Sequence, residues 1–107
     1  MYALRLARED IFFGPEEARL LGLVRDTGSV KLACAQLSLS YSKGWYILKR
    51  INLGVGTPVV ESIQGGTGGG YTVLTEKGRW LLDRFAAFEA DCREYAKKSF
   101  QTHFSEG

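Results

Sequence analysis

The sequence predicts a mainly α-helical fold with a small β component, an α+β domain. Two short stretches with apolar residues at helical spacing are separated by a serine-containing break. Two β-branched and aromatic stretches then flank a glycine-rich run, and a long stretch without proline closes the chain. The chain has 107 residues, enough for one domain with a modest core, and we assign residues 1–107 to it.

Composition restricts the class of protein more than its activity. Hydrophobic residues make up 45% of the chain, as in soluble globular proteins, and a net charge of +2 does not by itself identify a nucleic-acid binder. Cys34 and Cys92 lie far apart without a CxxC motif or a Cys/His cluster, so we interpret both as reduced core residues and expect no metal and no cofactor. No signal peptide or membrane-spanning apolar stretch is visible, which predicts a cytoplasmic protein.

The N-terminal region predicts a β-hairpin followed by a helix. Residues 2–7 alternate in polarity, and the apolar residues 11–13 follow a polar turn. The run Gly14-Pro15-Glu16-Glu17 predicts a helix start, because proline suits the first helical position and glutamates complement the helix dipole. Gly28 is expected to end this helix in a left-handed conformation.

Residues 29–52 predict two helices joined by a tight turn, with Ser40 as the N-cap of the second helix. Apolar or small residues follow an i, i+3, i+4, i+7 spacing in both helices: Val30, Ala33, Cys34 and Leu37, then Gly44, Ile47, Leu48 and Ile51. This arrangement is typical of a helix-turn-helix, whose second helix enters a DNA major groove. An ordinary helical hairpin in a small core has the same periodicity.

Residues 59–74 predict a two-stranded hairpin with a glycine-rich tip. A hairpin directly after a recognition helix is a wing, so the complete prediction is a winged helix-turn-helix. The last helix is expected at residues 76–100, with Thr75 as its N-cap. Its apolar residues recur at spacings of four and three, and we expect them to form a homodimer interface, although the first of them could complete the domain's own core: Leu81, Phe85, Phe88, Cys92 and Tyr95.

Several of these segments resemble a known family over about residues 2–90. The motifs are Gly28-Ser29-Val30, Ser40-Tyr41, Trp45, Pro58-Val59-Val60-Glu61, Gly65-Gly66-Thr67-Gly68-Gly69-Gly70 and Leu74-Thr75-Glu76-Lys77-Gly78-Arg79. They resemble the DNA-binding domain of molybdate-responsive ModE-type regulators and, more distantly, that of LysR-type regulators. The resemblance implies a winged helix-turn-helix that binds DNA.

The chain departs from this family in two ways. Full-length members continue into molybdate-binding domains, and 107 residues are too few to contain them. The chain therefore resembles the stand-alone DNA-binding part, and molybdate is not expected to bind it. Members also commonly place cations around the wing, where this chain has Ser62, Ile63, Gln64 and Thr67, which predicts fewer phosphate contacts.

The expected DNA contacts lie mainly on the second motif helix. Ser42 and Lys43 fall in its first turn, where lysine can bond guanine and serine can bond bases or phosphate. Lys49 and Arg50 are expected to hold phosphates, and Trp45 to pack between helix and wing. The full set of expected DNA-binding residues is Ser29, Lys31, Ser40, Tyr41, Ser42, Lys43, Tyr46, Lys49, Arg50, Gly66, Thr67 and Gly68.

The main functional prediction is a transcriptional regulator that binds double-stranded DNA at a roughly palindromic site as a homodimer. One alternative is an oxyanion-binding module that uses the glycine run as a nest of amides. Another is a protein-interaction module on a winged-helix scaffold that has lost strong DNA binding. An enzyme is not expected, because the single histidine, His103, has no nearby nucleophile or metal-ligand partner.

Overall fold

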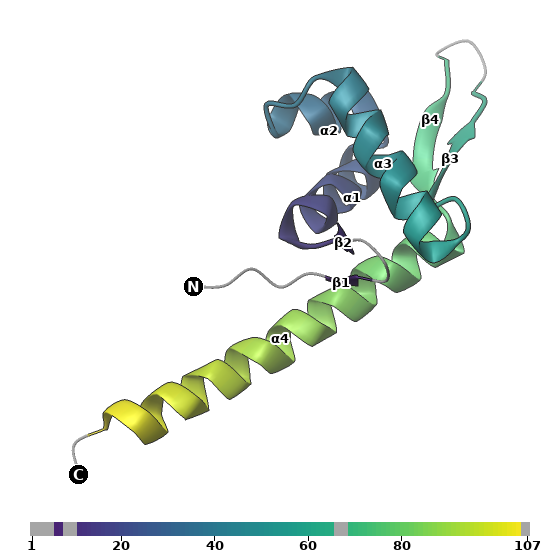
Figure 1. Ribbon diagram of the computed structural model, residues 1–107. Helices are drawn as coiled ribbons and strands as arrows, with labels where there is room; N and C mark the ends of the chain where they lie inside the picture. Colours follow the sequence, from purple (N-terminus) through teal and green to yellow (C-terminus); the bar gives the residue numbers. More distant parts are fainter. Residues whose placement is uncertain (1–5, 8–10, 66–68, 106–107) are drawn as a thin grey trace.

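The computed structural model describes residues 6–7, 11–65 and 69–105. Within them the fold is mostly helical, with two two-stranded antiparallel sheets and a long C-terminal helix (Figure 1). The elements in chain order are β1 (Leu6–Ala7), β2 (Ile11–Phe13), α1 (Pro15–Thr27), α2 (Val30–Gln36), α3 (Tyr41–Val55), β3 (Val60–Ile63), β4 (Tyr71–Leu74) and α4 (Glu76–Phe104). The predicted α+β class is confirmed at this level. Helix α4 continues to Phe104, four residues past its predicted end.

The helix ends follow from local sequence. Helix α1 begins at Pro15 and ends at Thr27, and its C-cap is Gly28, whose φ of 71° lies in the left-handed region that glycine adopts without a steric cost. Ser40 and Thr75 cap α3 and α4 as predicted. Their hydroxyl oxygens accept hydrogen bonds from the amides of Lys43 and Gly78, each at 3.1 Å.

Helices α2 and α3 approach closely because α3 has a glycine at the point of contact. A Cβ atom added at Gly44 would overlap the sulfur of Cys34. The turn between the helices includes Ser38 in a left-handed conformation, with φ of 57°, and the partly buried Leu39 packs against the core beneath it. The Ser38 conformation is strained for a non-glycine residue, so helix packing holds it in place.

The β3–β4 hairpin is joined to the helices by its backbone. Its register pairs Val60 with Leu74 and Ile63 with Tyr71. The Thr72 amide donates to the Gly28 carbonyl at 2.8 Å, and the Val59 amide donates to the Asn52 side chain at 2.9 Å. These bonds orient the hairpin relative to both α1 and α3.

The core lies between α1, α2, α3 and the first third of α4. Phe13 and Phe85 meet edge to face at its centre, with ring centroids 5.1 Å apart. Leu81 and Phe85 are thus buried within this chain, which differs from the expectation that they contact a second copy. The domain's own helices reach far enough along α4 to cover these two residues but not the later part of the apolar face.

Candidate nucleic-acid interface

One face of α3 is exposed and carries polar and cationic side chains. Gly44, Ile47, Leu48 and Ile51 are buried on the opposite face. Ser42, Tyr46 and Lys49 are exposed, and their i, i+4, i+7 spacing places them on one side of the helix. The structure therefore groups these three predicted residues on an outward surface.

The cations Lys43 and Arg50 flank this surface on the side of α1. The Lys43 ammonium lies 5.2 Å and the Arg50 guanidinium 6.0 Å from the centre of the Tyr46 ring, close enough for cation–π attraction. Both also line a small cavity of about 80 Å³ with Glu16 and Glu17 of α1. Their positive charge is therefore partly balanced by α1, whereas Lys49 lies on the outward surface.

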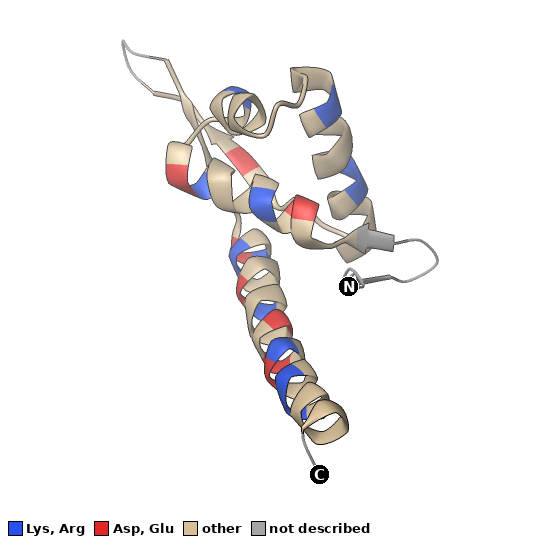
Figure 2. Ribbon diagram, turned by 90° about the vertical axis from the view of Figure 1, so that its left-hand side faces the viewer, with Lys and Arg blue, Asp and Glu red and all other residues tan. Residues whose placement is uncertain are grey.

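The charge distribution distinguishes α2 and α3 from the rest of the molecule (Figure 2). Helix α3 contains Lys43, Lys49 and Arg50 and no acidic residue, and α2 contains Lys31 and no acidic residue. Acidic and basic residues alternate along α4 instead. An anionic partner is thus electrostatically favoured over the α2–α3 surface.

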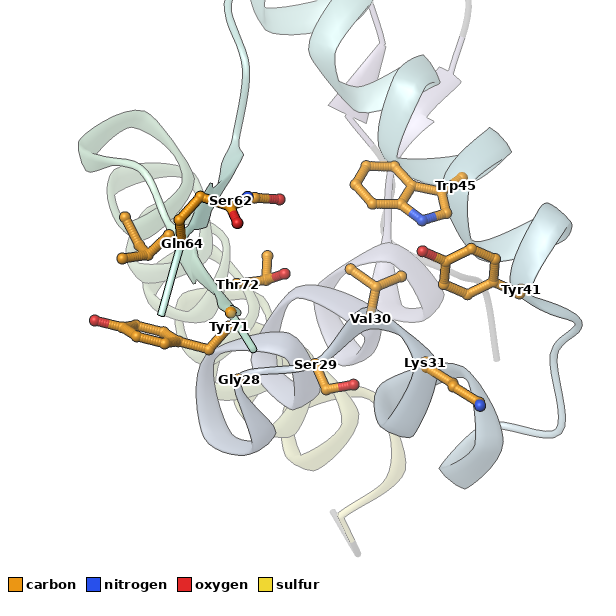
Figure 3. Close-up of a pocket in the computed structure, with 12 residues that line it drawn as sticks. Gly28, Ser29, Val30, Lys31, Tyr41, Trp45, Ser62, Gln64, Tyr71 and Thr72 are labelled. Carbon is orange, nitrogen blue, oxygen red and sulfur yellow. The ribbon is translucent and has the colours of Figure 1, made fainter. Parts of the chain in front are cut away.

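The side of α3 that carries Tyr41 and Trp45 forms one wall of a groove, and the β3–β4 hairpin forms the opposite wall (Figure 3). We call it the α3–hairpin groove; its volume is about 270 Å³. Tyr41 and Trp45 line it on α3, with ring centroids 6.3 Å apart in an edge-to-face arrangement. The remaining lining residues are Gly28, Ser29, Val30, Lys31, Ser62, Ile63, Gln64, Gly70, Tyr71 and Thr72.

Two predicted DNA-binding serines already serve as helix caps. The Ser29 hydroxyl accepts from the Leu32 amide at 3.1 Å, and the Ser40 hydroxyl accepts from the Lys43 amide. Each hydroxyl proton remains able to donate to a further acceptor. Lys31 is exposed beside Ser29.

The predicted contacts Gly66, Thr67 and Gly68 lie outside the described residues. Sequence reasoning did not include Ser62, Gln64 and Tyr71 among the site residues. The sequence did contain a signal for Ser62 and Gln64, because alternate residues of a strand and its extension point to the same face.

The thiol of Cys34 is buried in the α2–α3 contact. Burial raises the pKa of this thiol, and a hydrogen bond from the Gly44 backbone partly opposes the shift. The neutral thiol therefore fits the core as a small apolar group. Among the described residues, no three His, Cys, Asp or Glu side chains are grouped so as to hold a metal ion.

On α4, the apolar face beyond the core is exposed in the part of the chain that the structure describes. Phe88 is 41% exposed and Tyr95 74% exposed, with the half-buried Cys92 between them. None of the described helices combines the length and apolar character that crossing a membrane requires.

Comparison with known proteins relates the chain to molybdenum-associated proteins. No protein-family model matches it. The molybdenum-pterin-binding protein MopB of Rhodobacter capsulatus is 35% identical over 85 residues, or 79% of this chain and 32% of MopB. The transcriptional regulator ModE of Haemophilus influenzae is 30% identical over 77% of this chain and 32% of its own length. The molybdenum transport protein ModE of Azotobacter vinelandii is 33% identical over 68% of this chain and 27% of its own length.

The chain spans about a third of the length of these curated relatives. Their names describe regulation, transport or ligand binding and not catalysis, which is consistent with the expectation that the chain is not an enzyme. The expectation that molybdate does not bind this chain is contradicted, because relatives that align with 79% and 71% of the chain are named for molybdenum-pterin binding. Chain length was an unsound basis for excluding a molybdenum ligand.

Proposed function

We propose that this chain is the DNA-binding part of a molybdenum-related transcriptional regulator of the ModE type. In this proposal α2 and α3 are the helix-turn-helix and the β3–β4 hairpin is the wing. The observation that carries the proposal is the outward face of α3, with Ser42, Tyr46 and Lys49 exposed on a helix that has no acidic residue. The similarity to a protein named as a transcriptional regulator supports it.

The proposed contacts divide by position along α3. Ser42, in the first turn, is placed to meet base edges, and Lys43 can extend past the Tyr46 ring toward them. Lys49 and Arg50, two turns further on, are placed to hold phosphates. The N-terminal turn of α2 adds Lys31 for a neighbouring phosphate.

We extend the proposal to a homodimer through the uncovered face of α4. Phe88, Cys92 and Tyr95 recur at spacings of four and three, and a matching helix of a second copy would bury them. Two copies would present two α3 helices to the two halves of a palindromic site.

The test is titration of the purified chain against a fluorescent duplex from its own upstream DNA, at several salt concentrations and with unlabelled competitor. We expect Lys49→Ala to weaken DNA binding. It should also reduce the slope of the logarithm of the binding constant against the logarithm of salt concentration by about one, as expected for the loss of one phosphate contact. Lys97→Ala, which removes an exposed lysine from α4, is the matched control and should leave both unchanged. Equal salt slopes for wild type and Lys49→Ala would contradict the proposed face.

A second candidate function is binding of a molybdenum-containing ligand. The name of MopB refers to such a ligand and not to DNA, so the comparisons favour the oxyanion-binding alternative more directly than DNA binding. Equilibrium dialysis of the chain against molybdate, with bound molybdenum measured by mass spectrometry, tests it. Stoichiometric retention would support this candidate, and absence of retention at millimolar molybdate would contradict it.

A further inference from the structure

The α3–hairpin groove has the lining of a small-molecule site. We infer that it binds a planar heteroaromatic ring, of the pterin or nucleobase kind, carried by a small anionic molecule. The inference deepens the proposed function and rests on it only for the regulatory consequence below.

The two walls of the groove differ in chemistry. Tyr41 and Trp45 are four residues apart on α3, so their rings lie on the same side of the helix. Figure 3 shows Ser62, Gln64 and Thr72 of the hairpin across the groove from them, with Val30 between the walls. A flat ring placed against Trp45 would gain aromatic contact on one face while its edge met polar groups.

The polar groups favour a heteroaromatic ring over a hydrocarbon. Gln64 offers an amide donor and a carbonyl acceptor, and the hydroxyls of Ser62 and Thr72 can do both. Pterins and nucleobases carry alternating donors and acceptors at their edges, whereas a hydrocarbon would leave the groups of the groove without partners. Lys31 is the one charged residue among the described lining residues, which suits a single anionic substituent at the rim.

The groove is formed before any ligand arrives. The hydrogen bond from the Thr72 amide to the Gly28 carbonyl, at 2.8 Å, ties the hairpin to the turn between α1 and α2. Val30, which is 5% exposed, is held by the core beneath. A ligand would therefore order little of the protein, and the groove volume of about 270 Å³ accommodates a bicyclic ring.

A ligand in this groove would affect DNA binding. The groove opens between α3 and the hairpin, which are the two elements proposed to contact DNA. A bound ligand would occupy space between them, so ligand and DNA would each weaken the other's binding by the same factor.

The test is equilibrium dialysis of the full chain against pterin-6-carboxylate and, in a separate arm, against guanosine monophosphate. We expect saturable binding of one molecule per chain in at least one arm, and the arm that binds identifies the kind of ring. Trp45→Leu removes the aromatic face on which the ring would stack, so it should weaken binding of that probe by about tenfold. Because Trp45 also packs against the core, Gln64→Ala at an exposed position is the second variant, with Gln101→Ala on α4 as its control.

Weaker binding in Gln64→Ala with unchanged binding in Gln101→Ala would support the site. Absence of binding in both arms, or equal binding by all variants, would overturn it. DNA titration without ligand is run on the same protein. Failure to bind DNA in that titration would count against the proposed function but would not change the conclusion drawn from the dialysis.

Discussion

The two halves of α4 have the same apolar spacing and opposite environments. Phe85 is 1% exposed in the first half, whereas Tyr95 is 74% exposed in the second, on the same side of the helix. Figure 1 shows why: α4 leaves the other helices after its first turns and continues beyond them. Periodicity thus predicts which face of a helix is apolar, while the reach of the remaining chain decides how much of that face is covered.

The largest effect expected from this comparison is on stability. Phe85→Ala should lower the free energy of unfolding by about 3–5 kcal/mol, because it removes the ring packed against Phe13 and leaves a cavity. Phe100→Ala, in the exposed half, should change it by less than about 0.5 kcal/mol. Urea unfolding followed by circular dichroism measures both, and equal losses would contradict the difference between the halves.

The contact between α2 and α3 should tolerate added volume poorly. Gly44→Ala should lower the free energy of unfolding by about 1–3 kcal/mol, because the new methyl group would overlap the Cys34 sulfur in a packed interior. Gly22→Ala is the control, since its nearest neighbour is the end of the Arg25 side chain at 4.0 Å, and it should stabilise α1 by up to about 1 kcal/mol. A stabilising Gly44→Ala in the same unfolding assay would show that the helices can separate without cost.

The exposed half of α4 should determine association. Tyr95→Ala should raise the dimer dissociation constant by about tenfold, since it truncates a large apolar group at the proposed interface. Sedimentation equilibrium measures the constant, with Lys97→Ala as the control. A wild-type chain that stays monomeric at high micromolar concentration would contradict the proposed dimer.

The smallest effect concerns the buried thiol. Because burial raises the pKa of Cys34 in the folded state, the folded chain holds this proton to higher pH than the unfolded chain does. The stability that depends on the neutral thiol is therefore present below about pH 8.5, the usual thiol value, and is lost as pH rises above it. The free energy of unfolding, measured from pH 7 to 10, should decline more steeply for wild type than for Cys34→Ala, and equal declines would contradict the raised pKa of the Cys34 thiol.

Local signals allowed much of the fold to be predicted from the sequence. Gly28, Ser40 and Thr75 determine helix ends through backbone conformation and nearby hydrogen bonds, so neighbouring residues suffice to locate them. The candidate site was predicted less completely. The α3–hairpin groove depends on the Thr72–Gly28 hydrogen bond between distant segments, and no local pattern indicates it.

The helices, the hairpin positions and the apolar face of each helix could be predicted from the chain alone, because these follow from propensity, capping and periodicity. The packing of distant segments, in contrast, determines that Leu81 and Phe85 are buried while Tyr95 is exposed, and that Lys43 and Arg50 flank Tyr46 on the side of α1. It also decided that Tyr41 and Trp45 face the hairpin across a groove. Burial and charge balance depend on which distant segments meet, and the spacing of residues along the chain does not contain that information.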